Sequence, residues 1–140
     1  MARLEFFVVS RSVSIDQATN FASVLEILEV IQTSSFPAII PQCVAMSLWR
    51  QEPGDEDRDY QLTLRITTPS DITHEMQSNF RLTSPRHRVI QRIHGMHIER
   101  EGQLRFEAIL NGDHAAEHII DIWPGEAVDT VDSPASGSAA

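Results

Sequence analysis

Apolar and polar side chains alternate without exception through residues 60–66, which read Tyr60-Gln61-Leu62-Thr63-Leu64-Arg65-Ile66. Such alternation is typical of a β-strand that has one face in a core and the other in solvent. The same period of two returns in residues 104–110, where every second side chain is apolar. The strongest local patterns in the chain therefore predict strands, and none of comparable strength predicts a helix.

A turn signal directly follows the second of these segments. Asn111-Gly112 is a pair that tolerates positive φ at both central positions of a type I′ turn. The alternation then resumes with His118, Ile120 and Ile122. We therefore expect residues 103–123 to form a β-hairpin.

Other segments are expected to add short strands between turns. Further strands are expected in the apolar runs 4–9 and 43–49 and in the less regular segments 73–82 and 88–94, while residues 16–20 and the acidic stretch 52–59 have turn composition. Residues 21–32 fit both a helix and a strand, and their valines and isoleucines favour the strand.

Two prolines interrupt the segment that follows. Pro37 and Pro41 cannot donate backbone hydrogen bonds, so residues 36–41 are not expected in a central strand. They are interpreted instead as an extended crossover between two sheets.

About eight short strands in 140 residues indicate one all-β domain. We predict an antiparallel β-sandwich, immunoglobulin-like or jelly-roll-like, over residues 1–123, with a closed barrel as the alternative. Residues 124–140 are rich in Pro, Ala, Ser and acidic side chains and lack apolar periodicity, which predicts a disordered tail.

Charge and cysteine content restrict the function classes. The net charge is −9, and all eleven basic residues are arginines. The densest basic run holds Arg81, Arg86, Arg88 and Arg92 with His87, and at strand spacing the last three arginines share one face. The acidic surface argues against nucleic acid as a partner.

No apolar stretch is long enough to span a membrane, and one cysteine permits no internal disulfide, so we expect a cytoplasmic protein.

Two pairs of histidines lie close enough in the sequence to be candidate metal ligands. His94 and His97 are separated by two residues, and His114 and His118 by three. On a strand, residues four apart lie about 13 Å from each other, so His114 and His118 are not expected to share an ion. Solvent-facing or hydrogen-bonded histidines are the favoured interpretation, and we predict no metal-binding residues and no cofactor.

Other candidate sites have equally ordinary interpretations. Residues 55–59 could offer oxygens to calcium, but they lack the EF-hand spacing and Arg58 would compete for the carboxylates, so a solvated loop is the favoured interpretation. Cys43 is expected to be a buried small hydrophobe rather than a nucleophile. Trp49 and Trp123 could form a binding platform only if both are exposed, and packing is the more common role. The sequence contains no recognisable phosphate-binding or nucleophile-elbow motif.

The order of several motifs resembles a known family. Along the chain these are Glu5-Phe6-Phe7, Ser12–Asp16, Val24–Glu29, Phe36–Pro41, Leu48-Trp49-Arg50 and Arg86–Ile90. Together they resemble a family of small bacterial proteins that is known as a domain of unknown function. The resemblance covers about residues 3–123 and implies a compact cytoplasmic β-sandwich with strands in residues 21–32. It implies no activity and no catalytic residue.

These observations favour a non-catalytic binding or protein-interaction module, with no catalytic or cofactor-binding residue assigned. The expected partner is another protein, neither nucleic acid nor membrane, and the loops at 36–41 and 52–59 are its candidate binding loops. Two alternatives stay open: a small metal-dependent hydrolase that uses His87, His94, His97, His114 or His118, and a phage-type assembly subunit that pairs through edge strands.

Overall fold

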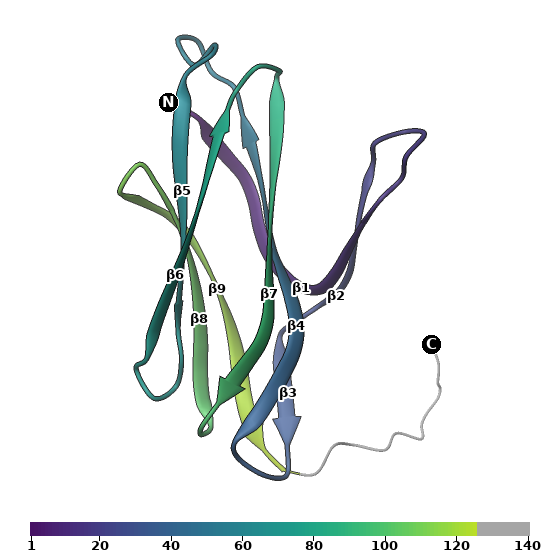
Figure 1. Cartoon of the computed structure of the whole chain (residues 1–140), viewed down its shortest axis with the longest axis vertical. Helices are drawn as coiled ribbons and strands as arrows, with labels where there is room; N and C mark the ends of the chain where they lie inside the picture. Colours follow the sequence, from purple (N-terminus) through teal and green to yellow (C-terminus); the bar gives the residue numbers. More distant parts are fainter. Residues whose placement is uncertain (126–140) are drawn as a thin grey trace.

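Residues 1–125, the part that the computed structural model describes, form nine strands in two sheets that face each other (Figure 1). One sheet has four strands in the order β2-β1-β4-β7, and the other has five in the order β3-β9-β8-β5-β6. The strands are β1 (Arg3–Ile15), β2 (Ala22–Ile27), β3 (Val30–Thr33), β4 (Ala38–Arg50), β5 (Asp59–Thr67), β6 (Thr73–Arg81), β7 (Arg86–Ile98), β8 (Gly102–Leu110) and β9 (Asp113–Pro124). The predicted β-sandwich is confirmed.

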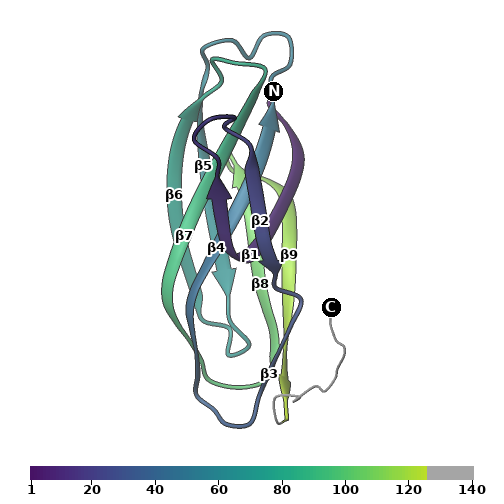
Figure 2. The same ribbon diagram turned by 90° about the vertical axis from the view of Figure 1, so that its right-hand side faces the viewer.

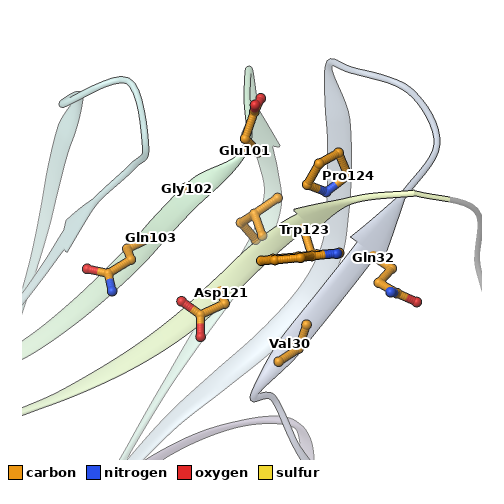
Figure 3. A pocket seen from close by; sticks show the side chains of 9 residues that line it. Val30, Gln32, Glu101, Gly102, Gln103, Asp121, Trp123 and Pro124 are labelled. Carbon is orange, nitrogen blue, oxygen red and sulfur yellow. The ribbon is translucent and has the colours of Figure 1, made fainter.

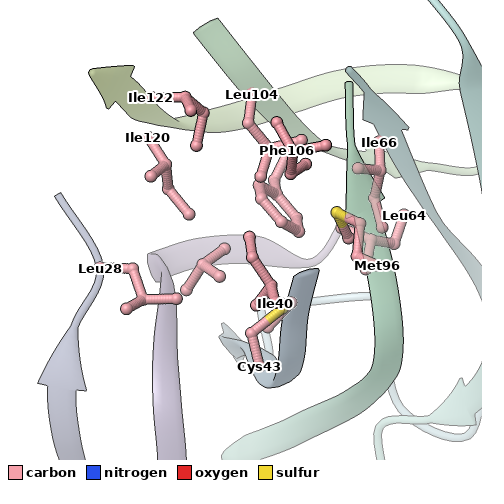
Figure 4. Close-up of a cluster of buried hydrophobic side chains, with 13 residues drawn as sticks. Leu28, Ile40, Cys43, Leu64, Ile66, Met96, Leu104, Phe106, Ile120 and Ile122 are labelled. Atoms are coloured by element: carbon pink, nitrogen blue, oxygen red, sulfur yellow. The ribbon is translucent and has the colours of Figure 1, made fainter. Parts of the chain in front are cut away.

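The apolar side chains of the alternating strands meet between the two sheets. Leu64 of β5 and Phe106 of β8 are fully buried in the largest core cluster (Figure 4). The four-stranded sheet contributes Ile40 and Cys43 from β4 to the same cluster. Full burial of one such side chain stabilises a fold by about 1.5–3 kcal/mol. The period of two seen in the sequence is thus the pattern that assembles the core.

The β8–β9 hairpin forms around its predicted turn. Asn111 has φ 49° and Gly112 has φ 87°, so both central residues have the positive φ of a type I′ turn. β9 continues to Pro124, one residue beyond the predicted domain boundary at 123. Gly125, also in the disordered tail predicted for residues 124–140, donates its N–H to the carbonyl of Thr33 at 2.9 Å, and residues 126–140 lie outside the described residues.

Residues 21–32 form two strands in different sheets. β2 pairs with β1 in the antiparallel sense, whereas β3 runs parallel to β9. The strand prediction is confirmed, but the expectation of purely antiparallel pairing is wrong for β3. Leu28 lies between the two strands, and its backbone N–H donates to the carbonyl of Val9 at 3.0 Å.

The proline-containing crossover is also part of a strand. β4 begins at Ala38 and includes Pro41, although residues 36–41 were predicted to lie outside any central strand. Over residues 38–43 the only ladder partner of β4 is β7, because β1 pairs with β4 only from Val44 to Arg50. Pro41 therefore lies where β4 is an edge strand, a position that tolerates proline.

The end of β1 and the whole of β2 form a hairpin that stands away from the sandwich (Figures 1 and 2). Its turn is stabilised by Asp16, whose Oδ1 accepts hydrogen bonds from the N–H groups of Ala18 and Thr19. Arg88 of β7 donates to the carbonyl of Asn20 in this turn at 2.8 Å. The hairpin is thereby tied to the outer face of the four-stranded sheet.

Membrane-spanning helices are absent from residues 1–125, since none of the secondary structure there is a long apolar helix.

Candidate functional site

Two of the candidate histidines, His87 and His118, make contacts between the two sheets. His118 of β9 is half-buried; its Nε2 lies 2.7 Å from the carbonyl of Leu28, and its Nδ1 accepts the N–H of Val9 at 3.4 Å. Because Nδ1 accepts, the proton belongs on Nε2, which donates to Leu28. His87 of β7 stacks on Phe80 with 4.9 Å between ring centroids and 5° between planes. Both rings hold the two sheets together and are poor candidates for binding a ligand.

His94 and His97 lie beside a groove between the edge strands β6 and β7, together with His74. The cavity has a volume of about 440 Å³, and Met76, Met96 and other apolar side chains form its walls. Within residues 1–125, the only three potential metal ligands that lie within 4.8 Å of one another are Glu107, His114 and Glu117. Among the described residues the three histidines of the groove form no such group. His114 lies beside Glu107, whereas His118 is bonded to the carbonyl of Leu28.

Cys43 occupies the position that was expected for it. It is fully buried in the core cluster, and burial raises the pKa of its thiol to about 11. A thiol with this pKa is protonated at neutral pH and is a weak nucleophile. The interpretation as a buried small hydrophobe is confirmed.

The carboxylate of Asp55 in the acidic turn is hydrogen-bonded within the protein. Asp55 is fully buried; it accepts hydrogen bonds from the Tyr60 hydroxyl and from the N–H of Glu52, and the amino group of Met1 lies 3.3 Å away. Desolvation opposes ionisation, but these contacts together hold the pKa of Asp55 below its usual range. The carboxylate is committed to the turn, so it is not available as the centre of an exposed calcium loop.

The two tryptophans do not form a platform. Trp49 is 1% exposed and belongs to a second core cluster with Tyr60 and Phe80, whereas Trp123 is 59% exposed on the other sheet. Trp123 lies in a surface pocket of about 710 Å³ at the end of the five-stranded sheet (Figure 3). Val30 of β3 and Asp121 of β9 line this pocket beside the indole.

The most unusual arrangement of charge lies on the four-stranded sheet. Arg3 of β1 pairs directly with Arg50 of β4, and Arg50 pairs directly with Arg86 of β7. We call these three residues the arginine row. Trp49 and His87, which neighbour Arg50 and Arg86 in sequence, point into the core, so the arginine row lies on the outer face.

Few acidic groups neutralise this arginine row. Arg86 donates to Glu5 at 3.0 Å. Among residues 1–125, Arg3 and Arg50 have no acidic side chain within salt-bridge distance. Like charges directly opposite each other on neighbouring strands destabilise a sheet. The arginine row therefore places like charges side by side, with an ion pair to an acidic side chain only at Arg86 among residues 1–125.

More positive charge continues from the arginine row along β7. Arg88 and Arg92 follow Arg86 at even spacing, so the predicted common face of these three arginines is confirmed by the register with β4. Exposed Phe6 and half-buried Leu48 pair with each other on the same face. The surface thus combines guanidinium groups with apolar area.

Sequence reasoning found only one end of this surface. It grouped the arginines of residues 81–92 but did not connect them to Arg3 and Arg50, which are distant in the chain. A common signal exists, since each member of the arginine row is next to a core residue at a strand end. Recognising it requires the register of three strands, which the local patterns do not contain.

Comparisons with known proteins add a family and a fold. Searching curated proteins finds no match. One similar solved structure is the alkylpurine DNA glycosylase AlkC of Pseudomonas fluorescens, bound to DNA containing an abasic site analog. It is 9% identical to this chain, with a TM-score of 0.50. The match covers 87% of this chain but only 30% of that one, so the similarity concerns the fold alone. An immunoglobulin-like protein of Pseudomonas aeruginosa is 11% identical with a TM-score of 0.39, over 87% of this chain and 96% of that one.

A family profile matches residues 5–122, nearly the whole sandwich. This agrees with the resemblance over residues 3–123 that the sequence motifs suggested. The chain belongs to the Family of unknown function (DUF6941).

Proposed function

We propose that this protein is a non-catalytic cytoplasmic binding module that holds an acidic segment of another protein on its arginine row. The observation that carries the proposal is the direct cross-strand alignment of Arg3, Arg50 and Arg86, in which only Arg86 has an acidic partner among the described residues. A guanidinium group binds a carboxylate through two parallel hydrogen bonds. Carboxylates placed between the arginines would replace repulsion by attraction.

An acidic protein segment suits this surface better than nucleic acid does. The chain carries 20 acidic residues, and the acidic turn 52–59 begins two residues after Arg50. A long phosphate backbone that extended beyond the arginine row would meet these negative charges. A short peptide could stay on the arginines and use Phe6 and Leu48 for apolar contact.

The test compares two double variants that lose the same charge. Arg3→Ser/Arg50→Ser removes the unpaired members of the arginine row, and Arg65→Ser/Arg100→Ser removes two arginines elsewhere. Binding of a labelled peptide rich in Glu and Asp is measured by fluorescence anisotropy, with a single-stranded oligonucleotide of similar charge as a second probe. Two surface ion pairs contribute about 0.4–2 kcal/mol, so the first variant should bind the peptide about 2- to 30-fold more weakly than the wild type.

The control variant should retain most of the wild-type affinity for the peptide. Equal loss in both variants would mean that only overall charge matters, and the proposal would then be wrong. Tighter binding of the oligonucleotide than of the peptide would instead favour a nucleic-acid partner.

A further inference from the structure

The β8–β9 hairpin (Figure 1) belongs to the five-stranded sheet. Three potential metal ligands of this hairpin lie close together near its turn. Glu107 belongs to β8, while His114 and Glu117 belong to β9. Each offers one ligand atom, and these atoms lie within 4.8 Å of one another. His114 Nε2 is 3.4 Å from Glu107 Oε2.

A β-bulge brings His114 and Glu117 to the same face. Residues three apart on a regular strand point to opposite faces. Here His114 pairs with Ile109 and Ala116 pairs with Ala108, so Ala115 is an extra residue without a ladder partner. The extra residue restores the common face, and re-aiming side chains in this way is a known use of bulges.

The cluster holds two facing carboxylates, with an arginine beside each of them. Arg65 of β5, the direct cross-strand partner of Glu107, is ion-paired with Glu75 at 2.9 Å. Glu107 and Glu117 are direct cross-strand partners, which places two carboxylates opposite each other. The Glu107 side chain is only 17% exposed, so water screens its charge incompletely. Arg105 approaches Glu117 at 3.8 Å, and its exposed side chain can turn away. A divalent ion between the carboxylates would remove their repulsion.

We propose that Glu107, His114 and Glu117 bind a divalent transition-metal ion of the Zn²⁺ type, with water in the remaining position. An imidazole with two carboxylates suits Zn²⁺ better than Mg²⁺ or Ca²⁺, which prefer oxygen ligands alone. Zn²⁺ with ligands at 2.0–2.2 Å brings neighbouring donors to roughly 3.3–3.5 Å. Exposed His114 and Glu117 need to move by only about 1 Å to reach this geometry.

This site is independent of the proposed peptide binding, because the arginine row lies on the other sheet. The experiment uses the full chain without a histidine tag and titrates it with ZnCl₂ alone in a calorimeter, with MgCl₂ as a second titrant. His114→Ala and Glu107→Gln each remove one ligand. The control, His74→Ala, removes an exposed histidine from β6 and leaves the Arg65–Glu75 ion pair intact.

Wild type should bind one equivalent of Zn²⁺ and should not bind Mg²⁺ with similar affinity. Changes next to metal ligands cost about 10- to 100-fold in affinity, so loss of His114 itself should cost at least about tenfold. The β6 control should match the wild type. Co²⁺ should give a visible d–d absorption band that His114→Ala abolishes while the circular dichroism spectrum stays unchanged.

Three results would overturn the proposal. These are the absence of one-to-one Zn²⁺ binding, equal affinity in His114→Ala and wild type, and loss of binding in the β6 control. The last result would indicate that Zn²⁺ binds in the histidine groove between β6 and β7 instead.

Discussion

His87 shows how one titratable side chain can make the core sensitive to pH. Its ring stacks on Phe80, which in turn packs against Trp49 and Tyr60. Burial, with a smaller effect of the neighbouring Arg88 charge, lowers the pKa of His87. Neutral imidazole is therefore the form that the folded protein prefers.

We expect the free energy of unfolding to decrease as the pH falls, because His87 is protonated more readily in the unfolded chain. The pKa in the unfolded chain is about 6.5, and the folded value is lower, so below pH 6.5 the unfolded state binds a proton that the folded state does not. The stabilisation is complete above pH 6.5 and is lost as the pH falls toward the folded pKa. Urea unfolding between pH 7.5 and 5.0 should show a declining midpoint for the wild type and a shallower decline for His87→Phe.

Exposed His97 offers the control for this measurement. His97→Ala should keep the wild-type pH dependence, because this ring lies in solvent beside the groove. A His87→Phe variant that declines as steeply as the wild type would show that other groups titrate in this range.

Individual residues also show the limits of local composition. The acidic turn 52–59 was expected to be a solvated loop, yet Asp55 is fully buried and holds the turn through Tyr60 and Glu52. Nothing in a run of acidic residues distinguishes the one carboxylate that turns inward. Asp55 is buried because its carboxylate accepts a hydrogen bond from the Tyr60 hydroxyl, and these two groups meet only in the folded protein.

At the scale of elements, the bulge at Ala115 makes a sharp prediction about deletions. Removing Ala115 leaves the pairs His114–Ile109 and Ala116–Ala108 intact, so every later side chain of β9 keeps its face. Removing Ile119 instead turns Ile120 and Ile122 from the core to solvent, because a shift of one residue reverses both faces.

The free energy of unfolding is the quantity to measure for these deletions. The Ala115 deletion should stay within about 1 kcal/mol of the wild type, whereas the Ile119 deletion should cost several kcal/mol or abolish folding, as expected when core side chains are lost. Similar losses in both deletions would contradict the assignment of Ala115 as the extra residue.

Strand existence was easier to predict than strand partners. Alternation located β5 and the β8–β9 hairpin, and an apolar run located β4, whereas β6 and β7 were expected from less regular segments. The period could not show that residues 21–32 divide between two sheets, or that β3 runs parallel to β9. Strand partners are chosen by contacts between segments that are distant in the chain, such as the hydrogen bond between Val9 and His118, which are 109 residues apart.

The whole molecule combines a net charge of −9 with a concentrated positive surface. Net self-repulsion destabilises the compact state, and salt screens it. Salt should equally screen the attraction between the arginine row and an acidic peptide. We therefore expect NaCl to raise the thermal midpoint of the free protein and to weaken its binding of the peptide.

Thermal unfolding and fluorescence anisotropy at about 0.05 and 0.5 M NaCl measure the two effects. A gain of about 1 kcal/mol would raise the midpoint by roughly 3–5 °C for a chain of this size. Peptide binding that is insensitive to NaCl would argue against electrostatic recognition by the arginine row.

The amino-acid sequence by itself determined that this chain is an all-β sandwich with a tight Asn111-Gly112 hairpin, because side-chain period and turn chemistry are local properties. Tertiary structure alone decided which residues became neighbours. It aligned Arg3, Arg50 and Arg86 across three strands, and it opposed Glu107 to Glu117 beside His114. The physical reason is register: a shift of one residue or one bulge changes every cross-strand pair while it leaves the local alternation almost untouched.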